Sequence, residues 1–184
     1  GPLDMRMDET QELTAGIVVN TYSSRELERI LRTYGEEPKA RRMAQLIVES
    51  RPLATTTQLA EVAKKVWPGH SRSHPATRLF QAIRIEVNNE LGQLSQALPA
   101  MVKLLAPNGR LGIITFHSLE DRIVKQFFKS MAGDRYDAEL IEITRQPRTA
   151  TPNELVINPR SRSAKLRVVA KIKTNPVVDL SSAP

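Results

Sequence analysis

The chain has 184 residues, of which 40% are hydrophobic, and its formal net charge is +7. This length is enough for one domain, or for a domain with a subdomain, and the hydrophobic share is compatible with a packed core. No run of about 18 apolar residues occurs, so a membrane-spanning helix is not expected. The absence of cysteine excludes disulfide bonds and thiolate metal sites, and it fits the reducing cytoplasm.

The beginning of the chain and its histidines argue against two further features. The first ten residues, GPLDMRMDET, are polar and acidic, whereas a signal peptide needs a basic and then an apolar segment. The three histidines, His70, His74 and His117, do not have the HExxH spacing of a zinc site. We therefore expect neither a secretory signal nor a metal centre.

Three short helices with short links are predicted between residues 23 and 67. Ser23 and Glu26 form the capping-box pattern that opens a helix, and Thr55 and Gln58 repeat that pattern before the third helix. Apolar residues recur at helical spacing behind each start. These residues are therefore predicted to form a small all-helical unit.

A longer helix is predicted to begin at Pro75. Its apolar residues step by 3, 4, 4, 3 and 4 positions, which is the period of one helical face. They are Phe80, Ile83, Val87, Leu91, Leu94 and Leu98. Pro99 is expected to kink or restart this helix, and the turn-forming Pro107-Asn108-Gly109 is expected to end it.

Residues 110–122, RLGIITFHSLEDR, are predicted to form a buried strand, a sharp turn and the start of a helix. Apolar residues occupy both faces of the extended part, which is typical of a strand inside a parallel sheet that helices cover. Ser118 and Asp121 have capping-box spacing. Ligands of open α/β sheets bind outside the carboxyl ends of such strands, so a site is expected at residues 117–122.

The remaining predicted elements are strands at 139–145 and 166–172, a helical turn capped by Thr151, a basic loop at 158–163 and a disordered tail at 174–184. These strands are too few to pair both edges of strand 110–116, so one apolar edge is expected to stay open. Either another chain completes the sheet or the sequence is a fragment.

Positive charge is concentrated near the end of the chain. Between residues 145 and 173, eight basic residues face one acid, Glu154. The basic residues are Arg145, Arg148, Arg160, Arg162, Lys165, Arg167, Lys171 and Lys173. Such a surplus is typical of a polyanion-binding surface, most simply one for nucleic acid, and the alternative is a solvated basic surface.

Several strings in this order resemble one known family. They are GPLDMRMD (1–8), YGEE (34–37), ARR (40–42), HPATRLFQAIRIEVNNEL (74–91), GRLGIITFHSLEDRIVK (109–125) and NPRSRSAKLRV (158–168). Together they resemble the bacterial small-subunit ribosomal RNA cytosine-N4 methyltransferase family, the MraW or RsmH type. The likeness runs from residue 1 to about residue 172.

The resemblance implies a partial class I, Rossmann-like methyltransferase sheet (an α/β fold) with an all-helical substrate-recognition insertion. Residues 1–8 would be a loop of the methyltransferase domain, 9–73 the insertion and 74–173 the C-terminal half of that domain. The family uses S-adenosyl-L-methionine, but its glycine-rich cofactor loop lies upstream of GPLDMRMD. No cofactor-binding residue is therefore carried over to this chain.

The family's reaction suggests candidates for contact with the target base. The attacking amine needs hydrogen-bond acceptors and in-line alignment with the methyl group, and the base must leave its stack. His117, Ser118 and Glu120 are the catalytic candidates. Asp121 could accept an amine hydrogen, although a helix cap explains it more simply. Arg122 is a phosphate contact or an ion-pair partner.

Positively charged and loop residues are the candidates for RNA contact. Arg160, Arg162 and Lys165 suit phosphate, because guanidinium and ammonium groups pair with anionic oxygens. His74 and Arg78 lie where the insertion would rejoin the sheet. The alternatives are a solvated loop for the basic residues and a backbone-bonded loop histidine for His74. Helix-to-loop hydrogen bonding is the alternative for Asn88 and Asn89, and Trp67 is expected to be a core residue.

Three functions remain open at the level of sequence. The first is the RNA-recognition half of the methyltransferase, inactive without its cofactor-binding half, with small-subunit ribosomal RNA or the assembling small subunit as partner. The second is a non-catalytic RNA- or ribosome-binding protein. The third is an interaction module whose open strand edge recruits another chain, with a homodimer as one form. A cytoplasmic location is expected for all three, and no membrane partner.

Overall fold

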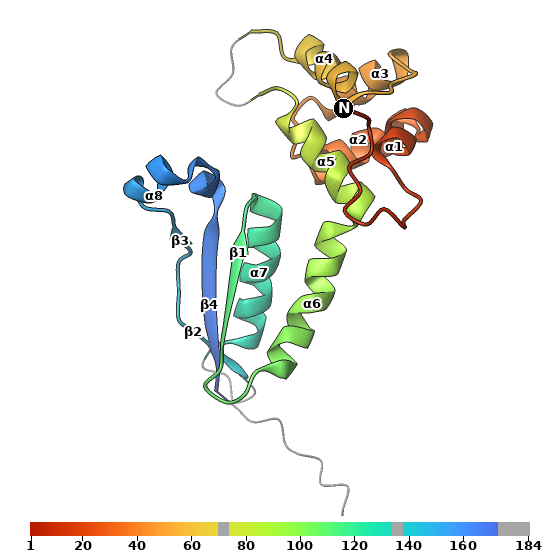
Figure 1. Ribbon diagram of the computed structural model, residues 1–184. Helices are drawn as coiled ribbons and strands as arrows, with labels where there is room; N and C mark the ends of the chain where they lie inside the picture. Colours follow the sequence, from red (N-terminus) through yellow and green to blue (C-terminus); the bar gives the residue numbers. More distant parts are fainter. Residues whose placement is uncertain (70–73, 134–137, 173–184) are drawn as a thin grey trace, which may run out of the picture. The chain divides into compact units, whose positions relative to one another are not determined.

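The computed structural model describes residues 1–69, 74–133 and 138–172 (Figure 1). Two compact units divide it, Gly1–Glu90 and Leu91–Pro184. The described residues form an α/β structure with eight α-helices, one 3-10 helix and a small antiparallel sheet. Among them, no helix combines the length and the apolarity needed to cross a membrane. The predicted tail at 174–184 and the cation Lys173 lie outside the described residues.

The Gly1–Glu90 unit is all-helical, as the pattern between residues 23 and 67 predicted. Its helices are α1 (Ala15–Thr21), α2 (Ser24–Thr33), α3 (Ala40–Glu49), α4 (Thr56–Val66) and α5 (Thr77–Asn88). Both predicted capping boxes are confirmed, with Ser23 and Thr55 as N-caps. Helix α1 was not predicted, because its seven residues are too few to show a period. The apolar faces of all five helices meet in one core.

Two polar contacts tie the loops of this unit to its helices. Asn88 is buried; its amide donates to the carbonyl of Met5 at 2.9 Å, and its oxygen accepts from the amide of Met7 at 2.7 Å. This is the helix-to-loop bonding that the sequence offered as one alternative. The indole of Trp67 packs against the core and donates to buried Glu37 at 3.0 Å, which confirms Trp67 as a core residue.

The long helix predicted from Pro75 is two helices, which is a correction. Helix α5 ends at Asn88, and α6 (Glu90–Leu104) begins two residues later and contains Pro99. The break is at Asn89, whose φ of 47° and ψ of 39° are left-handed. Asparagine tolerates this conformation better than most residues. The apolar period continues through Asn89 and therefore predicted one helix, whereas the backbone conformation of Asn89 divides it into two.

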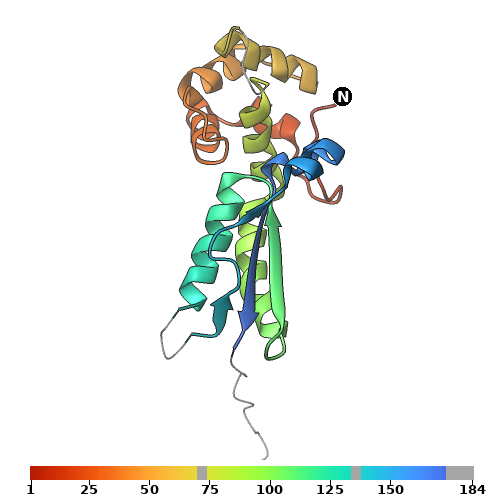
Figure 2. The same ribbon diagram turned by 90° about the vertical axis from the view of Figure 1, so that its left-hand side faces the viewer.

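The second unit is a sheet with helices on one face. Its elements after α6 are β1 (Arg110–Thr115), α7 (Ser118–Met131), β2 (Leu140–Glu142), β3 (Arg148–Thr149), α8 (Pro152–Ile157), the 3-10 helix η1 (Pro159–Ser163) and β4 (Lys165–Lys171). Both views show α6 and α7 on the same side of β1 and β4 (Figures 1 and 2). The core between helices and sheet includes Leu98, Phe128 and Val169.

The position of β1 in the sheet corrects one expectation and confirms another. Strand β4 pairs antiparallel with β1 on one side and with β2 and β3 on the other, so β1 is not inside a parallel sheet. Within the described residues β1 pairs with β4 alone, and its other edge is open, as predicted. Ile114 is 58% exposed and Phe116 54% exposed on the face away from α7.

The elements after α7 are shorter than the periodicity indicated. The predicted strand at 139–145 is confirmed only for Leu140–Glu142, and β3 was not predicted. The helical turn capped by Thr151 is confirmed as α8, and the last strand as β4. The predicted basic loop at 158–163 is mostly the 3-10 helix η1.

Candidate functional site

The turn between β1 and α7 is held by one glutamate and one histidine. His117 is the N-cap of α7, with extended backbone, and its Nδ1 accepts a hydrogen bond from the amide of Glu120 at 3.3 Å. Glu120 Oε2 in return accepts from the amides of Phe116 and His117, at 2.8 and 3.2 Å. His117 Nε2 also lies 3.4 Å from Glu120 Oε1. The turn is therefore fixed by side chains at both of its ends.

This geometry corrects the predicted capping box. Ser118 is the first residue of α7 rather than its cap, and Asp121 is not the residue that bonds back to the cap. The extended backbone ends one residue earlier than expected, at His117, and the helix begins at Ser118, so the cap and its partner move back one position. Glutamate at the third helical position reaches the cap amide, as in other capping boxes.

Asp121 instead forms a clamp between α7 and β4. Its carboxylate accepts two hydrogen bonds from Arg167, at 2.7 and 3.1 Å, and one from Lys165 at 3.3 Å. The side chains of Asp121 and Arg167 are only 11% and 7% exposed. Bidentate pairing of this kind fixes orientation as well as distance. The clamp therefore sets the first turn of α7 relative to β4, and with it the residues of the preceding turn.

The clamp also changes the acid–base behaviour of Asp121. Hydrogen bonds from Arg167 are the largest cause that lowers the pKa of this carboxyl below its ordinary value of 3.8, and Lys165 lowers it further, while burial opposes both. A lowered pKa means that the ionised form of the carboxyl is more favourable in the folded state than in the unfolded state. Asp121 therefore stabilises the fold above its ordinary pKa and loses that contribution as the pH falls through its folded pKa.

Substitution of Asp121 by asparagine should expose this dependence. At neutral pH, Asp121→Asn should destabilise the Leu91–Pro184 unit, because the amide cannot form the ion pair with Arg167. The difference from the unsubstituted chain should shrink as the pH falls below the ordinary pKa of 3.8 and through the lowered folded pKa, because the native carboxyl then becomes neutral as well. Amide exchange of β1 and β4 across this range measures it. A difference that stays constant with pH would show that the Asp121 charge does not contribute.

The structure divides the predicted basic surface into cations that are paired within the fold and exposed cations. Arg167 and Lys171 are buried, and Lys171 Nζ donates to the carbonyl of Val102, near the end of α6, at 3.1 Å. Lys165, predicted to contact RNA phosphate, pairs with Asp121. Alternation along β4 explains this, because residues 165, 167 and 171 share the face that α7 covers.

Four exposed arginines remain from the original eight cations, and three of them gather near the β1–α7 turn. Arg145, Arg148, Arg160 and Arg162 are all exposed. Ile114 of β1, Leu166 of β4 and Arg148 of β3 form one aligned row across the sheet. Thr115, Lys165 and Thr149 form the next row. Because η1 directly precedes β4 and contacts β3, Arg160 and Arg162 lie at the sheet end where β1 finishes (Figures 1 and 2).

Arg145 and Arg148 are residues that the sequence analysis did not single out. They were counted only as charge, because no motif surrounds them. Their exposure follows from the short β2 and β3 strands, which leave residues 143–147 as a connecting loop. Sequence spacing gave no signal of that loop, since residues 139–145 alternate as a longer strand would.

The other predicted contacts are distributed between the two units. His74 and Arg78 belong to the helical unit. His74 Nδ1 accepts from the amide of Ala76 at 3.2 Å, which is the backbone-bonded alternative, and Arg78 is exposed on α5. Arg122 is exposed in the first turns of α7, beside Asp121. The structure therefore brings together His117, Glu120, Asp121 and Lys165, and keeps His74 and Arg78 in a separate unit.

Comparisons with known proteins extend over nearly the whole chain. The model of the MraW methylase family matches residues 1–172. The chain is 50% identical to ribosomal RNA small subunit methyltransferase H of Heliobacterium mobile, over 93% of this chain and 61% of the relative. Proteins of the same name from Clostridioides difficile and Synechocystis are 48% and 49% identical, over 93% of this chain and 61% and 55% of their own lengths. The chain thus spans less than two thirds of these relatives.

Proposed function

The chain belongs to the MraW methylase family, and from this premise we propose that it is the RNA-recognition and C-terminal part of a small-subunit ribosomal RNA methyltransferase. In this proposal the enzyme transfers a methyl group from S-adenosyl-L-methionine to the N4 nitrogen of a cytidine. The partner is small-subunit ribosomal RNA or the assembling small subunit, which also places the chain in the cytoplasm. The sheet of the second unit is then part of a class I, Rossmann-like methyltransferase sheet.

One observation of the structure carries the proposal. The β1–α7 turn and the exposed Arg148, Arg160 and Arg162 occupy the same end of the same sheet. Ligands of open α/β sheets bind outside the carboxyl ends of the strands, which is where His117 lies. Arginine binds phosphate through paired N–H groups, so a nucleic-acid backbone held there brings its bases toward the turn.

The contacts at the turn suggest different roles for the three catalytic candidates. Glu120 Oε2 is already occupied by two backbone amides, so we assign Glu120 as a positioning residue. His117 Nδ1 already accepts from the amide of Glu120, and its Nε2 lies beside Glu120 Oε1, so we assign His117 as a positioning residue too. Ser118, which is exposed at the start of α7, is proposed to face the target nucleotide. Its task is to orient the extruded base and to accept hydrogen from its amine, so that the nitrogen lone pair points along the line of transfer.

The described residues do not by themselves fit the cofactor. S-adenosyl-L-methionine supplies an electrophilic methyl group when it is bound. Class I enzymes commonly hold such a ligand with free backbone amides of a glycine-rich strand–helix loop. Here the link from β1 to α7 contains no glycine, and Glu120 occupies the amides of Phe116 and His117. We therefore propose that residues outside this chain hold the cofactor, and we assign no step through it.

The open edge of β1 is the place where such residues would join. The curated relatives are longer than this chain, and Ile114 and Phe116 leave apolar surface exposed beside the unpaired edge. A strand from the remaining part of the family's chain would pair that edge and cover these side chains. A second copy of this chain is the alternative partner, and the molecular mass in solution distinguishes the two.

Reconstitution tests the proposed activity. The upstream part of the Heliobacterium mobile relative, which this chain does not cover, is mixed with the chain, small-subunit ribosomal RNA and methyl-labelled S-adenosyl-L-methionine. We expect label in RNA only when both polypeptides are present, and N4-methylcytidine in the digested RNA. The intact relative is the positive control. If it labels RNA while the mixture does not, or if the methyl group is on another atom, the proposed role is wrong.

A non-catalytic RNA-binding role is the second candidate. The exposed arginines favour it, because they would bind RNA whether or not a cofactor site is completed. It predicts that the chain binds small-subunit RNA with the same affinity in the presence and absence of the upstream polypeptide, and that no label is transferred.

A further inference from the structure

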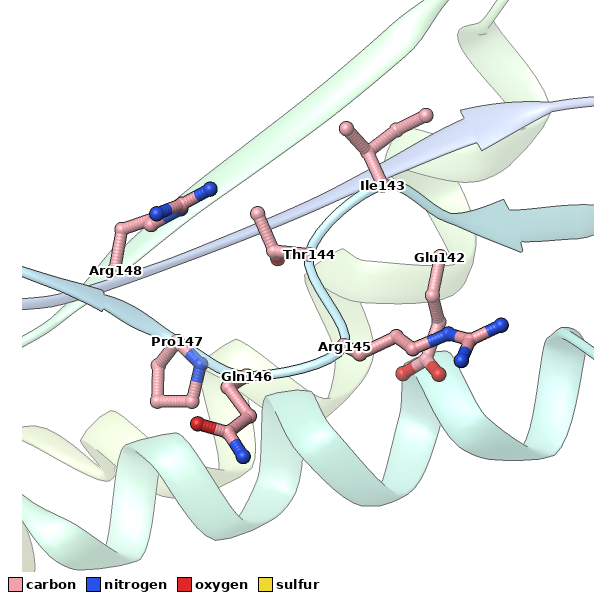
Figure 3. Close-up of a pocket in the computed structure, with 7 residues that line it drawn as sticks. All are labelled: Glu142, Ile143, Thr144, Arg145, Gln146, Pro147 and Arg148. Carbon is pink, nitrogen blue, oxygen red and sulfur yellow. The ribbon is translucent and has the colours of Figure 1, made fainter.

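The loop between β2 and β3 lines a surface hollow, and Arg148 is its one residue that the proposed function already uses. Its volume is about 470 Å³, and its lining is Glu142, Ile143, Thr144, Arg145, Gln146, Pro147 and Arg148 (Figure 3). Volumes of about 300–1,000 Å³ are usual for small-ligand sites. The hollow is thus large enough for one nucleotide.

The loop is anchored to β4 at one residue. The amides of Ile143 and Thr144 both donate to the carbonyl of Val168, at 2.9 and 3.2 Å. The hydroxyl oxygen of Thr144 accepts from the amide of Val168 at 2.8 Å. Three hydrogen bonds to one residue of the central strand hold the start of the loop in place, and the pairing of Arg148 with Leu166 holds its end.

The side chains of the hollow combine cationic, apolar and amide groups. Figure 3 shows Arg145 and Arg148 at opposite ends of the loop, with Gln146 and Pro147 between them. Both arginines are exposed, and neither has an ion-pair partner among residues 1–69, 74–133 and 138–172. Ile143 is half exposed and offers an apolar surface. Glu142 is the one acid of the lining.

We propose that this hollow binds one nucleotide of single-stranded RNA, as an extension of the site proposed above. Arg145 and Arg148 would contact the phosphates on either side of that nucleotide, since guanidinium groups pair with phosphate oxygens and their planes stack on unpaired bases. Ile143 and Pro147 contact the base or sugar, and the Gln146 amide, which both donates and accepts, meets the base edge.

Continuity with the neighbouring arginines favours RNA over a small free anion. Arg148 lies in β3, which contacts η1, and η1 carries Arg160 and Arg162. Arg148, Arg160 and Arg162 thus lie along β3 and η1, and Arg145 lies in the loop that leads into β3. A polyanion can contact all four arginines, whereas a single phosphate can contact one end only. This inference rests on the proposed RNA-recognition function and adds a specific nucleotide subsite to it.

Salt-dependent binding of the whole 184-residue chain tests the subsite. The probe is a labelled single-stranded RNA of about 12 nucleotides, a length within the usual range of such sites. Each phosphate contact to a single strand contributes about 0.7 to the slope of log K against log salt. Arg145→Gln/Arg148→Gln should therefore reduce the slope by about 1.4 and weaken binding about 25-fold near 0.1 M salt. Lys125→Gln/Lys129→Gln, which removes two exposed cations of α7, is the matched control and should leave the slope unchanged.

The outcomes separate this inference from the function on which it rests. If the unsubstituted chain binds no RNA, the RNA-recognition function fails and the subsite with it. If the chain binds and Arg160→Gln/Arg162→Gln lowers the slope, but Arg145→Gln/Arg148→Gln does not, the subsite is overturned and Arg148 is removed from the RNA contacts, while Arg160 and Arg162 still support the RNA-recognition function. Equal weakening with a duplex RNA of the same length would overturn the assignment to an unpaired nucleotide. A photo-crosslink from 4-thiouridine to the peptide containing residues 142–148 would support it.

Discussion

Replacing Arg167 with alanine is expected to destabilise the Leu91–Pro184 unit by about 3 kcal/mol, the lower end of the usual cost of breaking a buried ion pair. Among the residues that the structure describes, the substitution leaves the Asp121 carboxylate, 11% exposed, with the more distant Lys165 as its remaining ion-pair partner. It also removes an aliphatic stem from the layer between β4 and α7. Amide exchange of β1 and β4 should accelerate about 150-fold, which is the factor that corresponds to this free energy.

Two further variants decide whether the ion pair is the cause. Arg162→Ala removes an exposed arginine from η1. The free energy of opening that amide exchange reports should then change by less than about 0.5 kcal/mol. Asp121→Leu/Arg167→Met removes both charges and should recover much of the loss, because apolar pairs of similar volume can replace buried ion pairs. Equal effects of Arg167→Ala and Arg162→Ala would contradict the assigned role of the clamp. The fluorescence of Trp67 reports on the helical unit separately.

Asp121 also shows what sequence patterns can and cannot determine. Its spacing from Ser118 matches a capping box, and the spacing of Glu120 from His117 matches one equally well once histidine is allowed as a cap. Only the position where the strand stops being extended decides between them, and that position depends on the pairing of Thr115 with Lys165, fifty residues later in the chain. Local spacing therefore found the turn, but it assigned the cap to the wrong residues.

The helices were more predictable from the sequence than the sheet, because helices depend on neighbouring residues and the sheet depends on distant ones. Helices α2 and α4 follow from apolar period and local caps, and α7 follows from its apolar period; these patterns act within one or two turns. The sheet depends on contacts between distant residues, so the direction of β4 beside β1, the short length of β2 and the existence of β3 were not foreseen. Burial of Arg167 and Lys171 was missed likewise, because a cation at a core-facing position of β4 is stabilised by Asp121 and by Val102, which lie on other elements.

This division of the cations leads to the expectation for RNA binding. Arg160→Gln/Arg162→Gln should weaken binding of the chain to single-stranded RNA about 25-fold near 0.1 M salt and lower the salt slope by about 1.4, since each lost phosphate contact contributes about 0.7. Both residues are exposed in η1, and substitution there leaves the Asp121 clamp intact. Fluorescence anisotropy at several salt concentrations measures both quantities, and circular dichroism verifies that the variant is folded.

A cation that pairs with Asp121 provides the contrasting case. Lys165→Gln removes the same charge from a residue that pairs with Asp121, so its effect on the salt slope should be smaller than that of either exposed arginine. If Lys165→Gln lowers the slope as much as Arg160→Gln does, Lys165 contacts phosphate in the complex and must leave Asp121 to do so. Binding of RNA would then loosen the clamp, and the protection of β4 amides would fall rather than rise when RNA is added. The salt slope and the amide protection together therefore decide which cations are the RNA surface and which are the scaffold beneath it.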